Sequence, residues 1–330
     1  MDVAADVREA VHAGGLLAGD GRGRRIVVMV SGGRDSSCLL DVALQLRGPG
    51  ALCALHVNYG LRDAAGADDR HCAALCERLG VELRVVRARA PAEGTSGNLQ
   101  AWARELRYDA AARAAHELDA LVAAGHTASD QVETILYRLA ASPGRRALLG
   151  MRPREGDLVR PLLGLTREQT AAYCSARGIV WREDESNDDA TYARTRVRAG
   201  VVPALRSVHP AAEANVLRTA ALLREEAEVL DELLDAELAG EASIATARLA
   251  ELPAALARLV VVRLAEDAAG TYVPQAGGRV AEILALAARG GRAELHVGGL
   301  AGAVIEHGRL RMVRLAPRAG GAAGRPSAAD

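Results

Sequence analysis

The sequence predicts an α/β fold: a parallel five-stranded sheet with helices on both faces, followed by a smaller, mostly helical C-terminal domain with a short β meander. From residue 25 to residue 140, short apolar runs rich in β-branched residues alternate with longer segments whose apolar residues recur at helical spacing. Beyond Pro210 this alternation gives way to leucine-rich helical patterns. We therefore expect a parallel sheet covered on both faces in the first part of the chain.

Local patterns predict each element of the first domain. Apolar runs predict strands at residues 26–30, 51–57, 82–87, 120–124 and 158–162. Helical periodicity predicts helices at residues 6–17, 36–46, 67–79, 98–116 and 129–140, and a further helix that Thr166 opens. The segment 142–157 is rich in Gly, Pro and Arg and is expected to be a loop.

The second part of the chain has its own pattern. Helices are expected at residues 213–237, 253–267 and 274–288, and strands of a meander at 293–297, 303–306 and 310–315. The Gly- and Ala-rich end is typical of disordered chain. We expect a first domain over residues 1–209, a second over 210–316 and a disordered tail over 317–330.

Composition limits the function. The net charge of −1 argues against a protein that coats nucleic acid, although a local basic surface is compatible with it. Five cysteines without framework spacing favour a reducing compartment, so we expect a cytoplasmic protein. The acidic N-terminal segment is unlike a signal peptide, and no apolar run is long enough to span a membrane.

The first functional motif is Ser31-Gly32-Gly33-Arg34-Asp35-Ser36, which lies between a predicted strand and a predicted helix. Such a turn directs backbone N–H groups and a helix dipole at an anion, and Ser36 is a candidate N-cap. The chain contains no lysine, so the motif is not a Walker loop. A carboxylate beside phosphates implies a bridging Mg²⁺, which makes Asp35 a candidate metal ligand. The alternative is an ordinary turn without a ligand.

The second motif, Gly125-His126-Thr127-Ala128-Ser129-Asp130-Gln131-Val132-Glu133-Thr134, follows the fourth predicted strand. The carboxyl ends of parallel strands meet at one edge of a sheet, so we expect this motif beside the first. It would bring His126, Asp130 and Glu133 next to the glycine turn of the first motif, where a phosphate would bind. The alternative is helix capping by the two acids.

The third motif is an acidic run, Asp184-Glu185-Ser186-Asn187-Asp188-Asp189, followed by Tyr192, Arg194, Arg196 and Arg198. The spaced arginines are suited to a surface that contacts phosphates, because guanidinium groups bind phosphate through two N–H donors. Alone, the same pattern is equally typical of a solvated loop and helix face.

Together these motifs resemble the tRNA(Ile)-lysidine synthases of the PP-loop ATP pyrophosphatase family. The series that carries the resemblance is SGGRDS (31–36), HVNYGLR (56–62), ARELRY (103–108), GHTASDQVET (125–134), LLGM (148–151), RPLL (160–163) and DESNDDxxYxRxRxR (184–198). It covers roughly the first 200 residues. Departures from the usual pattern occur at Asn58, Tyr59, Thr127, Ser129 and Thr195 and in the loop 142–146.

The resemblance implies an adenine nucleotide α-hydrolase-like fold and a two-step reaction with ATP and Mg²⁺. ATP adenylates the wobble cytidine of an isoleucine tRNA with a CAU anticodon, and free L-lysine then displaces AMP. The implied ATP-binding residues are Ser31, Gly32, Gly33, Arg34, Asp35 and Ser36, and the implied catalytic residues are Asp35, His126, Asp130 and Glu133. Arg104, Arg107, Arg194 and Arg196 would contact nucleotide or tRNA. A homodimer is a further implication.

Other functions fit parts of the sequence. Thiolating PP-loop enzymes use a pair of catalytic cysteines, often C-x-x-C, whereas Cys72 and Cys76 lie four apart. A zinc site at His71, Cys72 and Cys76 would lack an evident fourth ligand. Amidating members need a nucleophile at the start of the chain, where Asp2 stands. A non-catalytic RNA-binding module is the alternative from another functional class.

Overall fold

The computed structural model describes residues 2–18, 23–60, 65–88, 99–141, 144–182 and 193–316. The chain divides into two compact units, Met1–Leu223 and Arg224–Asp330. The predicted domain boundary after residue 209 stays a prediction, and the predicted tail 317–330 lies outside the described residues. Within the part of the chain that is described, no helix is both long and apolar enough to cross a membrane.

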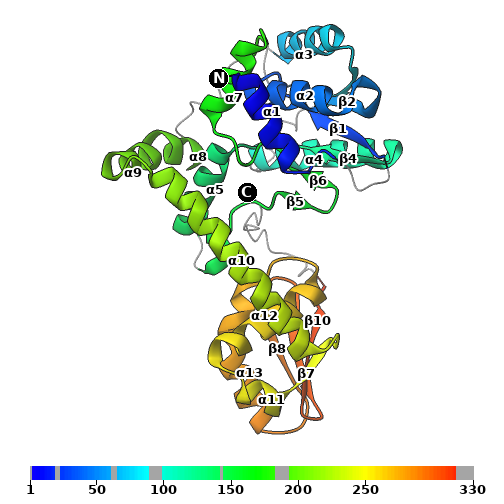
Figure 1. Ribbon diagram of the computed structural model, residues 1–330. Helices are drawn as coiled ribbons and strands as arrows, with labels where there is room; N and C mark the ends of the chain where they lie inside the picture. The colour runs from blue at the N-terminus through cyan, green and yellow to red at the C-terminus, as the bar shows by residue number, and fades with distance from the viewer. Residues whose placement is uncertain are drawn as a thin grey trace. The chain divides into compact units, whose positions relative to one another are not determined.

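A six-stranded sheet with the order β3-β2-β1-β4-β6-β5 forms the centre of the first unit (Figure 1). Its strands are β1 (Arg25–Met29), β2 (Leu52–Asn58), β3 (Glu82–Arg87), β4 (Ala120–Ala123), β5 (Arg154–Glu155) and β6 (Leu158–Val159). The five predicted strands run parallel, as expected. Gly156, with a φ of 60°, allows a tight turn that brings β5 back antiparallel to β6.

The prediction of a five-stranded sheet is therefore wrong by one edge strand. The segment 142–157, expected to be a loop, contains β5 and the short helix α6 (Arg145–Leu148). Both are too short to produce a periodic sequence pattern, which explains why the sequence did not reveal them.

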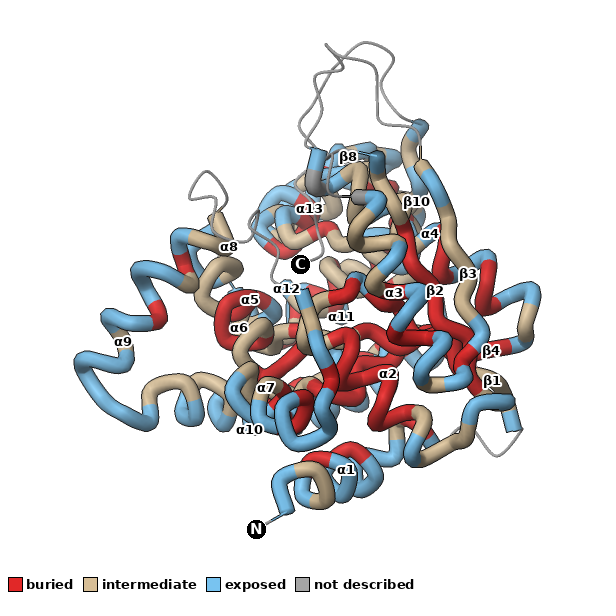
Figure 2. Tube along the Cα trace, turned by 90° about the horizontal axis from the view of Figure 1, so that it is seen from above, coloured by how far each residue is buried: buried red, intermediate tan, exposed pale blue. Residues whose placement is uncertain are grey.

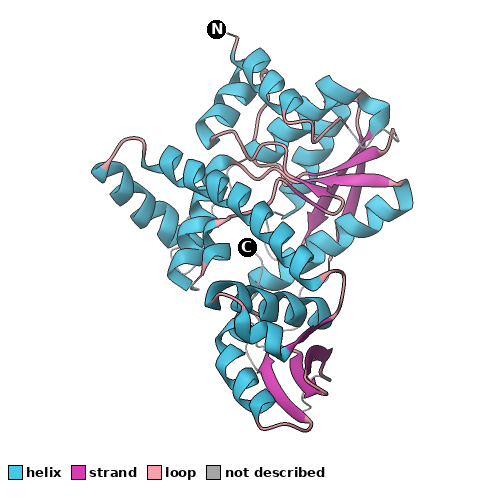
Figure 3. Cartoon of the chain, turned by 60° about the horizontal axis from the view of Figure 1, so that its bottom comes forward, coloured by secondary structure: helices cyan, strands magenta, loops and turns pink. Residues whose placement is uncertain are grey.

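Helices cover both faces of this sheet (Figure 3). The covering helices are α1 (Val3–Ala13), α2 (Arg34–Arg47), α3 (Ala65–Leu79) and α7 (Arg167–Ala176) on one face and α4 (Leu99–Leu118) on the other. Side chains alternate between the two faces along each strand, so both faces need cover. In β1, Ile26 and Val28 belong to the core under α1, α2, α3 and α7, while Val27 and Met29 belong to the core under α4. Figure 2 shows the buried residues concentrated in the central strands and in α2.

The described part of the chain contains further helices before the second sheet. Two of them lie between strands, the single turn η1 (Pro49–Ala51) before β2 and α5 (Ala128–Ala141) after β4. The others come after β6 and are α8 (Ala193–Arg196), the π-helical turn η3 (Val197–Val201), α9 (Val202–Val208) and α10 (Ala212–Leu238). A capping box begins α7, in which the Thr166 hydroxyl accepts the Gln169 N–H and the Gln169 side chain accepts the Thr166 N–H. The prediction that Thr166 opens this helix is confirmed.

The second unit contains a four-stranded antiparallel sheet with the order β7-β10-β9-β8. Its elements are β7 (Ser243–Ala245), α11 (Thr246–Glu251), α12 (Ala254–Ala269), η4 (Pro274–Arg279), α13 (Val280–Ala288), β8 (Ala293–Gly298), β9 (Ala301–Glu306) and β10 (Arg309–Arg314). The meander β8–β10 is confirmed, whereas β7 was not predicted. The helix expected at 274–288 begins as a 3-10 helix that contains Gly277. A Cβ at Gly277 would lie 3.1 Å from Val262 Cγ2, so this residue permits close packing on α12.

We expect Tyr173→Phe to lower the free energy of unfolding by about 1–3 kcal/mol, because a buried carboxylate would lose a donor. The Tyr173 hydroxyl donates to Asp41 Oδ2 at 2.6 Å, and Arg177 Nε donates to the same oxygen at 2.9 Å. Burial, and then Asp41, raises the pKa of Tyr173. Urea unfolding measures the change, with Tyr137→Phe as the control expected to stay within about 0.5 kcal/mol.

Candidate active site at the carboxyl edge of the sheet

The turn between β1 and α2 is braced by its own side chains. Ser31 Oγ accepts the Gly33 N–H at 3.3 Å, while Ser36 Oγ accepts the Ser31 N–H at 3.1 Å and donates to the Gly33 carbonyl at 2.9 Å. Gly32 has a φ of +82°, and a Cβ there would lie 3.2 Å from the His71 ring. Only glycine suits this position.

The predicted N-cap at Ser36 is wrong. Gly33 is the N-cap, and α2 begins at Arg34, so Ser36 lies in the first helical turn. Gly33 is the last residue with an extended backbone before the helix begins, and it follows directly on the left-handed Gly32. The helix N-terminus still directs its dipole toward the turn, which favours an anion there.

The second motif lies directly against this turn. A Cβ at Gly125 would lie 3.1 Å from both the backbone carbon of Asp35 and the nitrogen of Ser36. The segment that leaves β4 therefore passes next to the start of α2, and α5 begins three residues later, at Ala128. The prediction that both motifs meet at the carboxyl edge of the sheet is confirmed by this contact.

One arginine joins the predicted carboxylates. Arg167, the first residue of α7, places one terminal nitrogen 2.7 Å from Asp130 Oδ1 and the other 3.0 Å from Glu133 Oε1. Its Nε lies 4.0 Å from Asp35 Oδ2. Asp35, Asp130 and Glu133 thus share one cationic partner, although they come from two different helices.

Hydrogen bonds also determine the orientation of Asp130. Its Oδ2 accepts the N–H of Thr127 at 2.8 Å and the hydroxyl of the same residue at 2.9 Å. Burial opposes the charge of this carboxyl, but the guanidinium of Arg167 and the Thr127 N–H hold its pKa below the ordinary value. Asp130 is therefore ionised at neutral pH, as helix capping and a proton-accepting role both require.

Two arginines of the third motif contact neighbouring residues of α5, Glu133 and Thr134. Arg198 in η3 donates to both carboxylate oxygens of Glu133, at 2.8 and 3.2 Å. In α8, Arg194 donates to the Thr134 hydroxyl at 3.1 Å, and Arg196 follows two residues later. The acidic run 184–189 and Tyr192 lie outside the described residues, so the structure gives no account of that part of the prediction.

Asp35 is suited to a metal ion that is bound mostly by phosphates. Its carboxylate accepts the Thr170 hydroxyl and lies 3.1 Å from Arg34 Nε. Among the described residues, no group of three or more His, Cys, Asp or Glu is arranged to hold a metal. Mg²⁺ commonly binds through one or two carboxylates, water and substrate phosphates, so Asp35 alone fits an ion that arrives with a nucleotide.

Polar atoms without a hydrogen-bond partner gather around His126. They include His126 Nδ1, Arg107 Nε and Arg160 Nε, all buried, and the charges of Arg107 and Arg160 act on His126. The guanidinium groups of Arg104 and Arg107 lie 4.9 and 5.6 Å from the centre of the Tyr108 ring. Buried donors without partners carry a large energetic cost, and they fit a site that is completed by an anionic ligand.

Burial is the main reason that the pKa of His126 falls to about 3; Asp130 opposes the shift, and Arg160, Arg107 and Arg104 add to it. The residue is therefore neutral at pH 7. In the unfolded chain it takes up a proton near its ordinary pKa of 6.5, so the unfolded state binds more protons between pH 6.5 and 3. The contribution of neutral His126 to the free energy of unfolding is therefore complete above pH 6.5 and is lost as the pH falls toward 3.

We therefore expect the neutral His126 to add a slope of about 1.4 kcal/mol per pH unit to the unfolding free energy below pH 6. Urea unfolding from pH 7 to pH 4 measures this slope. The variant His126→Gln removes the titrating group and should show a shallower slope than the unmodified protein. Equal slopes in the two proteins would contradict a lowered pKa of His126 in the folded state.

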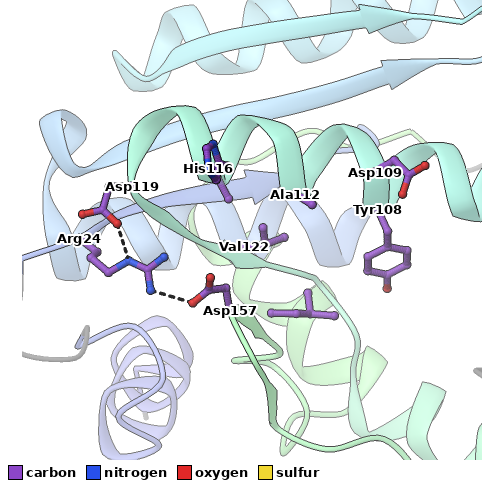
Figure 4. A pocket seen from close by; sticks show the side chains of 10 residues that line it. Arg24, Tyr108, Asp109, Ala112, His116, Asp119, Val122 and Asp157 are labelled. Atoms are coloured by element: carbon purple, nitrogen blue, oxygen red, sulfur yellow. Dashed lines mark hydrogen bonds and ion pairs between the residues drawn. The ribbon is translucent and has the colours of Figure 1, made fainter. Parts of the chain in front are cut away.

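A cavity lies away from this site, at the amino-terminal edge of the sheet (Figure 4). It has a volume of about 720 Å³. Arg24 lies between two acids on its wall, 3.3 Å from Asp119 and 2.7 Å from Asp157. These residues precede β1, β4 and β6, so the cavity is at the end of the strands opposite to the candidate site.

Sequence reasoning missed Arg167, Thr170, Arg160 and the contact of Arg198 with Glu133. One signal was present for Arg167, since a basic residue at the first position of a helix opposes the helix dipole. Thr170 had no comparable signal, because its contact with Asp35 depends on how α7 packs against α2. Arg160 begins the RPLL motif (160–163), but that pattern assigned it no role.

The sequence is similar to those of known proteins. The sequence model of the PP-loop domain matches residues 8–205. The tRNA(Ile)-lysidine synthase of Pseudomonas fluorescens (strain Pf0-1) is 39% identical over 218 residues, which are 64% of this chain and 48% of that protein. The synthase of Azoarcus sp. (strain BH72) is 38% identical over 268 residues, 78% of this chain and 58% of that protein. The chain therefore spans about half the length of the curated relatives it matches.

A solved structure shares the fold. The U34-tRNA thiolase NcsA from Methanococcus maripaludis matches with a TM-score of 0.57 at 17% identity, over 67% of this chain and 79% of that one. At this identity the likeness concerns the fold alone. The PP-loop model, by contrast, matches more than half of the sequence, including the turn after β1 and the acids of α5. The chain therefore belongs to the PP-loop domain family.

Proposed function

We propose that this protein is a tRNA-modifying ligase that forms lysidine. It uses ATP to adenylate the wobble cytidine of an isoleucine tRNA with a CAU anticodon, then joins free lysine to that base with release of AMP, which changes codon reading from AUG to AUA. One observation carries the proposal: the glycine turn and the acid pair Asp130 and Glu133 form one constellation, as a two-step reaction at one base requires. The names of the curated relatives support the same substrate.

In the first step the 2-oxo oxygen of cytosine attacks the α-phosphorus of ATP. The bond between the α-phosphorus and the bridging oxygen breaks, and pyrophosphate leaves. The N-terminus of α2 and the turn formed by Ser31, Gly32, Gly33, Arg34 and Ser36 would hold the phosphates. Asp35 would hold Mg²⁺, which offsets the charge of the departing pyrophosphate.

In the second step the ε-amine of lysine attacks C2 of the base, and the bond from C2 to the activated oxygen breaks as AMP leaves. The amine must lose its proton to act as a nucleophile. Asp130 and Glu133 are the acceptors we propose for the ammonium group and its proton. His126, neutral at pH 7, would contact phosphate or orient the acid.

The tRNA would be bound through its backbone. Arg104 and Arg107 on α4 and Arg194 and Arg196 on α8 are the proposed contacts to nucleotide or tRNA phosphates. The chain has a net charge of only −1, so binding would depend on this local arginine surface and weaken steeply with salt. The proposal includes a cytoplasmic location and a homodimer as its finer points.

Base thiolation, the activity in the printed name of NcsA, is less well supported. All five cysteines are free and buried. Burial raises the pKa of Cys72 to about 12 and that of Cys76 to about 11, so neither is a ready nucleophile. The same burial disfavours a zinc site at this pair, since zinc binds thiolates.

The test uses the full chain with ATP, Mg²⁺, isotopically labelled lysine and an isoleucine tRNA transcript with a CAU anticodon. Stable label in the RNA, with AMP release that depends on both tRNA and lysine, is the expected result. Release of AMP and pyrophosphate without label in the RNA would support the PP-loop cleavage of ATP but would show that the proposed substrate is wrong. A complete lack of ATP cleavage would favour a non-catalytic RNA-binding module.

A further inference from the structure

Arg167 occupies a place that helix stability does not explain. The first turn of α7 already has a complete capping box formed by Thr166 and Gln169. A cation at the first helical position opposes the helix dipole, so this arginine weakens the helix that carries it. Its side chain is only 21% exposed, and its charge is directed at α5 and α2 rather than at solvent.

The acids of α5 need such a cation. Asp130 and Glu133 lie one helical turn apart, with side chains only 20% and 5% exposed. Like charges at this spacing repel each other, and burial strengthens the repulsion. Arg167 spans the pair with separate nitrogens of one planar group, a geometry that an ammonium group lacks. Arg198 contacts Glu133 only, so among the described contacts Arg167 is the link between the two acids.

We propose that Arg167 is a positioning residue for the amine-transfer step, holding Asp130 and Glu133 in the orientation in which they receive the ammonium group of the amino-acid substrate. This inference rests on the proposed function. The looser approach of Arg167 to Asp35, at 4.0 Å, makes its contribution to the nucleotide step smaller. The two half-reactions should therefore respond differently when Arg167 is changed.

Arg167→Gln removes the charge and keeps a hydrogen-bonding side chain, whereas Arg167→Lys keeps the charge and removes the two-nitrogen span. Each variant is measured in two assays: lysine-independent pyrophosphate release with tRNA and ATP, and incorporation of labelled lysine over a range of lysine concentrations. Arg177→Gln is the matched control, because Arg177 is also an arginine at an end of α7 that pairs with a carboxylate, Asp41. Thermal unfolding shows whether each variant is folded.

For Arg167→Gln we expect kcat/KM for lysine to fall by about 100-fold, mainly through a higher KM, while pyrophosphate release changes by less than about threefold. For Arg167→Lys we expect kcat/KM for lysine to be about tenfold higher than for Arg167→Gln. Unchanged kcat/KM for lysine in folded Arg167→Gln, or an equal loss in both half-reactions, would overturn the inference. Failure of the unmodified protein to incorporate lysine would instead refute the proposed function, and the inference with it.

Discussion

Replacing Asp35 with asparagine should reduce pyrophosphate release by at least about 100-fold, equivalent to about 2.7 kcal/mol of transition-state stabilisation. Asparagine has the same shape and can still accept the Thr170 hydroxyl, so the turn should keep its structure. It lacks the negative charge that holds a divalent cation beside the phosphates. The effect should therefore appear as a lower rate and a higher requirement for Mg²⁺.

The control for this experiment is Asp157→Asn. Asp157 also pairs with an arginine, Arg24, at 2.7 Å, but it lies at the opposite edge of the sheet. The Asp157→Asn substitution should alter pyrophosphate release by less than twofold. If Asp35→Asn released pyrophosphate within threefold of the unmodified protein, the assignment of Asp35 to the metal would be wrong.

Asp130→Asn should reduce incorporation of lysine by at least about 100-fold while pyrophosphate release stays within about tenfold. The amide can still accept the Thr127 N–H through its oxygen, so the local turn should persist. It can neither accept a proton from the incoming amine nor neutralise Arg167. A loss of about 1–3 kcal/mol in the free energy of unfolding should accompany the change, because the partly buried guanidinium of Arg167 loses one of its carboxylate partners.

Both half-reactions are measured on the same sample, so a general loss of folded protein would lower them together. Asp157→Asn again serves as the matched variant, since it also breaks an arginine–carboxylate pair. A fully active lysine step in Asp130→Asn would show that the acceptor of the proton is another group. Glu133, which Arg198 holds in two hydrogen bonds, would then be the next residue to change.

Much of the first unit was predictable because its central strands are buried on both faces. The continuous apolar run 26–30 predicted β1 within one residue at each end. The bounds of β3 were also predicted without error, although this edge strand is only half-buried. Strand β5, with two exposed residues, left no such pattern. Strand β7 was missed for a similar reason, since three residues are too few to show alternation.

The candidate site likewise has features that the sequence predicted and features that it did not. By itself, the sequence determined that a glycine turn precedes α2 and that His126, Asp130 and Glu133 follow β4, because parallel strands bring such segments to one edge of the sheet. Only the tertiary structure decided that Arg167 pairs with Glu133, 34 residues away, and that Arg198 reaches the same acid across 65 residues. Local periodicity reflects which face of an element is buried, whereas ion pairs between elements depend on how those elements pack, which no local pattern records.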